Sequence, residues 1–69
     1  MKLDYSKKYT DKRNSAIIRG TTANGQHCFL RRELPNGHPI SWEEYEAGLG
    51  FYARWQPVRP EVLRIVEKN

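Results

Sequence analysis

The dipeptide Asn-Gly occurs twice in the sequence, at Asn24-Gly25 and Asn36-Gly37, twelve positions apart. Asn and Gly tolerate positive φ angles, so such pairs between β-prone runs are typical of tight hairpins. Pro35 precedes the second pair and favours the first central position of a type I turn. We therefore predict two three-residue hairpin loops joining a three-stranded antiparallel meander, with strands at about 15–22, 26–34 and 38–41.

The predicted loop length also sets the pairing of the strands. It places Ile18 opposite Leu30 in the first hairpin and Arg32 opposite Ile40 in the second. Because paired residues share a face and side chains alternate, one face is predicted to be apolar. Its members are Ile18, Cys28, Leu30, Leu34 and Ile40, with Arg32 near its edge. The other face is predicted to be open and basic, with Ile17, Arg19, His27, Phe29, Arg31 and Glu33.

A helix is predicted to cover the apolar face. The segment Ser41-Trp42-Glu43-Glu44 has the S-x-x-E pattern of a capping box, and Trp42, Tyr45 and Leu49 form one stripe at helical spacing. Periodicity leaves residues 51–56 open between helix and strand. After Pro60 we predict a short helix over 61–67, with a β-strand as the alternative because its residues are β-branched.

Length and charge limit the range of folds and functions. The chain has 69 residues, which is one small domain, and its 12 Lys and Arg against 8 Asp and Glu give a net charge of +4. This excludes a multidomain enzyme and an acidic DNA mimic. Basic residues are concentrated in residues 1–34. We expect residues 1–14 to form a basic flexible arm and residues 15–69 a small α+β domain.

The sequence contains no pattern of catalytic or metal-binding residues. It lacks a nucleophile motif, a Gly-rich phosphate loop and a His-Glu-x-x-His zinc motif. We therefore expect no enzymatic activity, no cofactor and no metal. Cys28 is the one cysteine, so no internal disulfide can form. No apolar run is long enough to span a bilayer and no leader is evident, so we expect a cytoplasmic protein without membrane contact.

The basic arm and the basic sheet face together predict nucleic-acid binding. Lys and Arg neutralise phosphates and release counterions, and an aromatic ring offers a plane on which a base stacks. The candidate contacts to DNA or RNA are Lys7, Lys8, Lys12, Arg13, Arg19, His27, Phe29 and Arg31. The expected role is that of a regulator or recombination factor encoded by a phage or mobile element.

The order of arm, meander and helix over about residues 8–50 resembles the small sheet-type DNA-binding domains of some phage and transposon integrases. The resemblance lies in element order and charge placement, and it implies a sheet face laid in the major groove.

An aromatic cluster supports a second hypothesis. Five aromatic residues lie in the segment that begins at Trp42 and ends at Trp55, both included, and Trp, Tyr and Arg are enriched at binding hot spots. The alternative function is that of a small phage-type inhibitor or adaptor, which binds a host protein or CRISPR effector through Tyr52, Arg54 and Trp55. The aromatic residues could instead supply the core. A third possibility is self-association through strand 15–22, which the meander places at a sheet edge.

Overall fold

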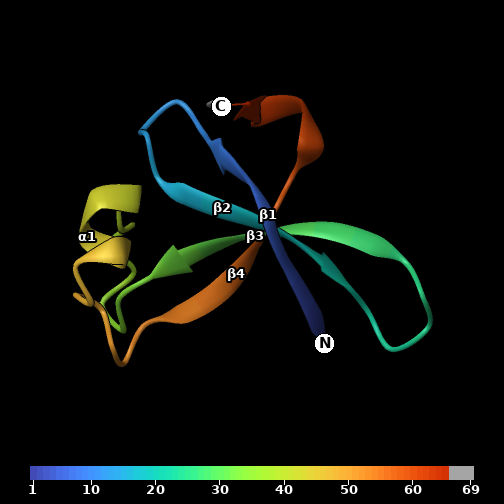
Figure 1. The fold of residues 1–69 in the computed structure, drawn as a ribbon, viewed down its shortest axis with the longest axis horizontal. Coiled ribbons are helices and arrows are strands. Elements are labelled where there is room, and N and C mark those ends of the chain that lie inside the picture. Colours follow the sequence, from blue (N-terminus) through green and yellow to red (C-terminus); the bar gives the residue numbers. More distant parts are fainter. Residues whose placement is uncertain (66–69) are drawn as a thin grey trace.

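The computed structural model describes residues 1–65, which form a twisted antiparallel sheet with two short helical segments (Figure 1). The strand order is β4-β3-β2-β1-β5. The strands are β1 (Lys2–Thr10), β2 (Ala16–Thr21), β3 (His27–Glu33), β4 (Arg54–Val58) and β5 (Arg64–Ile65), and the helical segments are α1 (Trp42–Glu46) and the 3-10 helix η1 (Pro60–Val62). The chain is thus broadly α+β, with β structure dominant.

The first predicted hairpin and its register are confirmed. Ile18 lies opposite Leu30, and Gly20 lies opposite Cys28. Gly25 has a φ of 87°, in the left-handed region that the predicted turn requires. The Asn-Gly turn therefore forms as local sequence chemistry dictates.

The second turn also forms in the predicted register, but residues 38–41 are not a strand. The amide of Leu34 donates to the carbonyl of His38 at 2.8 Å, and that of Ile40 donates to Arg32 at 3.2 Å. Beyond this, the segment makes only isolated bridges. Ser41 is already the N-cap of α1, so the pairing with β3 ends at Ile40.

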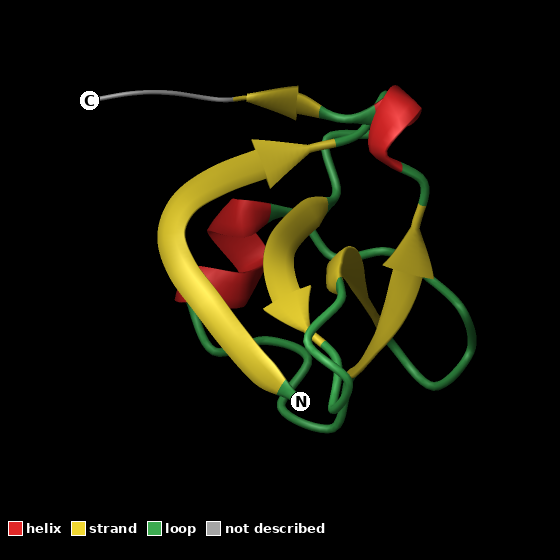
Figure 2. Ribbon diagram, turned by 90° about the vertical axis from the view of Figure 1, so that its right-hand side faces the viewer, coloured by secondary structure: helices red, strands yellow, loops and turns green. Residues whose placement is uncertain are grey.

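Residues 1–14, predicted to be a flexible arm, instead contain β1. This strand curves along one side of the molecule (Figure 2) and pairs with both β2 and β5. Backbone hydrogen bonds to two neighbours order the segment, and Tyr9 is buried. Because β1 pairs with the edge of β2 that the meander would leave free, β2 lies inside the sheet and not at its edge. Self-association through strand 15–22 therefore loses its structural basis.

The predicted capping box of α1 is confirmed. The Ser41 hydroxyl accepts a hydrogen bond from the Glu44 amide at 3.2 Å, and the Glu44 carboxylate accepts one from the Ser41 amide at 3.1 Å. The indole of Trp42 donates to the carbonyl of Tyr9 at 2.7 Å, which connects α1 to β1. The predicted stripe is wrong at Leu49, which is 58% exposed, because the helix ends before it and the next residues turn outward.

Arg32 lies on the apolar face, as the register predicts. Ile18, Leu30 and Ile40 on this face are buried. The Arg32 guanidinium carbon lies 5.0 Å from the Tyr45 ring centroid and 5.4 Å from that of Trp55. Its Nη2 donates to the carbonyl of Gly50 at 2.9 Å. Aromatic faces and one carbonyl thus stabilise a charge that the apolar face would otherwise exclude.

The opposite face, predicted to be open, is partly covered. Ile17 is fully buried there, and the rings of Tyr9 and Phe29 meet edge to face at 5.3 Å. The curvature of β1 brings Tyr9 over this face, opposite Ile17. The three-stranded, groove-facing layout implied by the resemblance to integrase domains is therefore not what the chain adopts.

The segments left open toward the carboxyl end are resolved in part. Residues 51–56 lead into β4, so the extended alternative is right from Arg54 onward. In the predicted helix over 61–67, the structure has the end of η1 followed by β5. Residues 66 and 67 of that prediction lie outside the described residues.

Candidate anion-binding pocket

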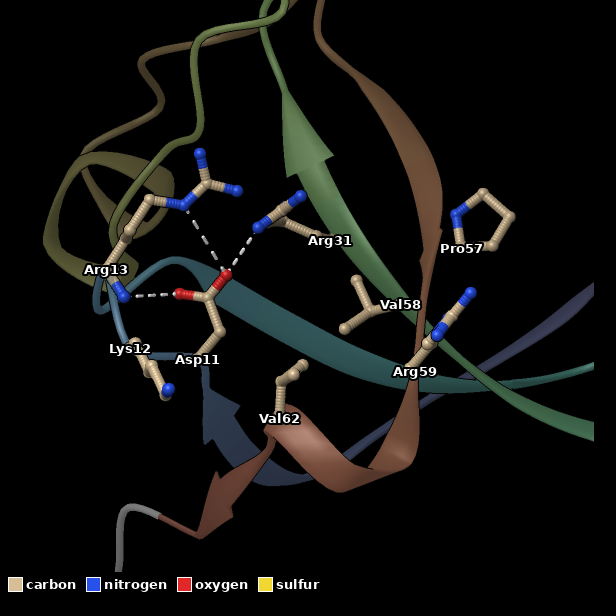
Figure 3. Close-up of a pocket in the computed structure, with 8 residues that line it drawn as sticks. All are labelled: Asp11, Lys12, Arg13, Arg31, Pro57, Val58, Arg59 and Val62. Atoms are coloured by element: carbon tan, nitrogen blue, oxygen red, sulfur yellow. Dashed lines mark hydrogen bonds and ion pairs between the residues drawn. The ribbon is translucent and has the colours of Figure 1, made fainter.

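A pocket opens where the β1–β2 turn, β3, the end of β4 and η1 come together (Figure 3). Its volume is about 330 Å³. Most of its polar side chains are basic, and the rest of its lining is apolar. The lining residues are Asp11, Lys12, Arg13, Arg31, Pro57, Val58, Arg59 and Val62.

Asp11 organises the turn that forms one side of the pocket. Its Oδ1 accepts hydrogen bonds from the amides of Arg13 at 2.8 Å and Ser15 at 3.1 Å. The amide of Asn14, which has a φ of 60°, donates to the Asp11 carbonyl at 2.9 Å. With its backbone held in this way, the turn leaves the side chains of Lys12 and Arg13 exposed at the rim of the pocket.

Arg31 is held by two carboxylates. Its Nη1 lies 2.5 Å from Asp11 Oδ2, and its Nε lies 3.0 Å from Glu33 Oε2. The side chains of Asp11 and Arg31 are only 5% and 19% exposed. Burial alone would raise the pKa of Asp11, but hydrogen bonds from Ser15, Arg13 and Arg31 outweigh it and lower that pKa. Arg31 is therefore a neutralised structural cation rather than a free contact.

Arg59 lies on the side of the pocket opposite the turn. Figure 3 shows Val58 and Val62 between Arg59 and the Asp11–Arg13 turn. Arg59 precedes Pro60, and its backbone is extended, with φ −73° and ψ 135°. A residue before proline is restricted to this region, so the direction from which Arg59 enters the pocket is set by its neighbour.

The charges around the pocket do not balance. Four basic residues line it, and Asp11 and the neighbouring Glu33 oppose them. Over these six side chains, a surplus of two positive charges remains. Within residues 1–65, no carboxylate forms an ion pair with Lys12 or Arg59. Cations on the rim and apolar side chains between them make a surface suited to an anion that carries an organic group.

Three further candidate residues lie on the same face of the sheet as the pocket. Arg19 lies opposite Phe29, and Phe29 lies opposite Val58 in the pocket. The Arg19 guanidinium is exposed, 5.8 Å from the centroid of the Phe29 ring. His27 is exposed, with Nδ1 3.4 Å from the Thr21 hydroxyl. Val58, Phe29 and Arg19 thus form a row across β4, β3 and β2, and this row places the Arg19 cation on the same face as the pocket.

The two lysines of β1 differ in what they contact. Lys7 is exposed. Lys8 forms an ion pair with Glu46 at 2.6 Å and lies 5.6 Å from the ring centroid of Trp42. Both partners of Lys8 belong to α1, so the structure does not bring this lysine to the pocket.

The alternative protein-binding residues are not brought together either. Tyr52 is 82% exposed, while Trp55 is half-buried, with its ring centroid 5.9 Å from that of Tyr45. Arg54 is exposed. Phe51, which the sequence interpretation did not select, is 79% exposed and packs edge to face on Tyr52 at 5.1 Å. The exposed apolar loop therefore consists of Leu49, Phe51 and Tyr52.

The sequence interpretation also missed Arg59 and the apolar lining of the pocket. These residues follow the aromatic cluster and are distant in sequence from the basic segment around Lys12, so no local motif links them. Only the pairing of β4 with β3 brings them to Arg31.

Comparison with known proteins identifies no relative: no protein-family model, curated protein or solved structure matches the chain. In the part of the chain that the structure describes, no helix is long and apolar enough to cross a membrane. Among the same residues, no group of three or more His, Cys, Asp or Glu side chains is placed to hold a metal ion.

Proposed function

We propose that this protein is a small, non-enzymatic nucleic-acid-binding accessory protein, as expected of a regulator or recombination factor. The observation that carries the proposal is the surplus of positive charge around the pocket. Lys12, Arg13 and Arg59 are the principal contacts in this proposal, and Arg19 and His27 are further contacts on the same face.

The physical basis is the attraction of these cations for backbone phosphates. Each phosphate neutralised by Lys or Arg releases condensed counterions, which favours binding at low salt. The exposed side chains at the rim of the pocket and Arg19 offer contacts to successive phosphates of one nucleic-acid strand. Phe29 is half-buried between Tyr9 and Arg19, so its expected role is to support Arg19 rather than to stack on a base.

The proposal is tested by fluorescence anisotropy with labelled single-stranded and duplex oligonucleotides over a series of salt concentrations. Binding should weaken as salt rises, and Lys12→Ala or Arg59→Ala should each reduce the log–log slope by about 0.7 on single strands or about 0.9 on duplex. Arg54→Ala is the matched control, because Arg54 is an exposed arginine outside the pocket. Absence of binding to any of these oligonucleotides at low salt would refute the proposal.

A second candidate function is that of an inhibitor or adaptor for a host protein. The exposure of Leu49, Phe51 and Tyr52 on one loop favours it, since large aromatic side chains at the surface often mark protein interfaces. A pull-down from lysate with and without nuclease tests it. A band that survives nuclease and disappears with Tyr52→Ser supports this function, and loss of all captured protein after nuclease contradicts it.

A further inference from the structure

We propose that the pocket recognises a nucleotide phosphomonoester, in particular the phosphorylated end of a nucleic-acid strand. This inference rests on the proposed function and adds the chemical class of the ligand. It depends on the charge of the pocket, its shape, and the way in which the backbone of its turn is held.

The charge of the pocket matches a phosphomonoester better than a phosphodiester. After Asp11 and Glu33 neutralise part of the basic set, two positive charges remain. A phosphodiester within a strand carries one negative charge, whereas a phosphomonoester carries about −1.5 to −2 at neutral pH. A terminal phosphate therefore uses the whole surplus, and an internal phosphate uses only half of it.

The shape of the pocket fits one terminal nucleotide. Basic side chains stand on two sides of an apolar strip formed by Val58 and Val62 (Figure 3). A volume of about 330 Å³ is near the lower end for small-molecule sites, which begin at about 300 Å³. A phosphate held by Arg59 at one side of this strip would leave its sugar or base over the valines, toward Lys12 and Arg13. An internal phosphate has a nucleotide on each side, and the second of these would have to lie outside this volume.

The basic side chains are available to an anion because the nearest carboxylate, Asp11, is bound to other groups. Asp11 is occupied by Arg31 and by two backbone amides. The ion pair between Arg13 Nε and Asp11 Oδ2 is long, at 3.9 Å, and the Arg13 side chain is more than half exposed. Lys12, Arg13 and Arg59 are exposed. Asp11 holds the backbone of the turn that carries Lys12 and Arg13, so an anion has to order the side chains there but not the turn itself.

Two labelled single strands with the same number of phosphates test the inference. One has a 5′-phosphate, and the other is one nucleotide longer and has a 5′-hydroxyl. We expect the phosphorylated strand to bind about tenfold more tightly, equivalent to about 1.4 kcal/mol. Lys12→Ala and Arg59→Ala should each reduce that preference, while Arg54→Ala should preserve it.

Competition with small molecules separates the sources of the phosphate and tests the apolar strip. Thymidine 5′-monophosphate should displace the phosphorylated strand at lower concentration than inorganic phosphate does. If the monophosphate binds as tightly as the strand, the ligand is a free nucleotide of the same chemistry. If inorganic phosphate competes equally well, the valines contribute nothing and the assignment of a nucleotide is overturned.

The outcome also distinguishes this inference from the proposed function. Equal affinity for the two strands, with salt-dependent binding retained, overturns recognition of the phosphorylated end and leaves nucleic-acid binding intact. Failure of both strands to bind at low salt overturns both.

Discussion

The substitution Asp11→Asn removes one negative charge from the centre of the turn while leaving its shape nearly unchanged. The Asn amide oxygen can still accept from the backbone amides of Arg13 and Ser15, which Asp11 Oδ1 does now. At the other position an NH₂ group replaces Oδ2 and faces the Arg31 guanidinium, 2.5 Å away in the wild-type protein. The variant therefore removes the charge-assisted bond between Asp11 and Arg31, together with the looser ion pair of Asp11 Oδ2 with Arg13 at 3.9 Å.

The expected loss of stability is about 2 kcal/mol. A hydrogen bond to a charged group contributes about 1.5–3 kcal/mol. Removing one partner of a fully buried pair costs about 3–5 kcal/mol, but Arg31 keeps its second partner, Glu33, at 3.0 Å. The whole domain is expected to have about 3–10 kcal/mol of stability, scaled from its length. Loss of one charge should therefore produce a large fractional change.

Urea unfolding followed by tryptophan fluorescence measures this effect. With a slope of about 1 kcal/mol per molar, the midpoint should fall by about 2 M. The control is Glu46→Gln, which breaks the exposed Lys8–Glu46 pair and should cost less than about 1 kcal/mol. A midpoint for Asp11→Asn equal to that of the wild type would refute the reasoning, as would an equal loss for Glu46→Gln.

Lowering the pH should reduce the difference in unfolding free energy between the wild type and Asp11→Asn. The pKa of Asp11 is lower in the folded protein than in the unfolded chain because of its hydrogen bonds. The stability it contributes is therefore fully present above the unfolded value of about 3.9 and is lost as pH falls through the folded value. The stability gap between wild type and Asp11→Asn should be constant from neutral pH to about pH 5 and should narrow below about pH 4.

Three further substitutions test the packing, each by urea unfolding. Gly50→Ala should cost about 2–4 kcal/mol, because its φ is +75° and a Cβ would collide with the buried Ile40. Gly48→Ala is the control: a Cβ there meets open space, so only its positive φ should cost stability, about 1 kcal/mol. Equal losses for the two variants would contradict the collision. Arg32→Lys should cost about 1–2 kcal/mol and alter the fluorescence of Trp55, because an ammonium lacks the planar group that stacks there; unchanged stability and emission would contradict stacking. Trp42→Phe should cost about 1–3 kcal/mol by leaving a β1 carbonyl without its donor, and an unchanged midpoint would show that water replaces the indole.

The local elements of the fold could be predicted because their causes lie within a few residues. Asn24-Gly25 determines both the turn and the register of the first hairpin, and the reciprocal bonds of Ser41 and Glu44 start α1 where the capping pattern indicates. In such places, the interactions that stabilise the structure are between neighbours in the sequence.

β1 could not be predicted in the same way, because its pairing is irregular. Leu3 lies opposite Gly20, and Tyr9 lies opposite Ile17. Gly20 and Ile17 face opposite sides of the sheet, so Leu3 and Tyr9 do as well, although both are odd-numbered positions. The register shift between Asp4 and Tyr9 breaks the alternation by which a strand is recognised.

The candidate pocket could be predicted only in part. The charge of Lys12, Arg13 and Arg31 marks them as candidate contacts, but nothing in the neighbouring sequence indicates that Asp11 and Glu33 neutralise Arg31. Arg59 joins the pocket through the pairing of β4 with β3. Charge composition thus predicted the character of the surface, while long-range strand pairing determined which cations face a ligand.

The double pairing of β1 has a consequence for the order of folding. Tyr9 pairs with Ile17 on one side and with Ile65 on the other, so β5 has no place to dock until β1 is in position. The β1–β2 and β2–β3 hairpins can form from nearby residues, whereas the β1–β5 contact closes most of the described chain into one loop. Such distant contacts slow folding. During synthesis, β1 should therefore pair with β2 first, and its other edge should stay unpaired until β5 has been synthesised.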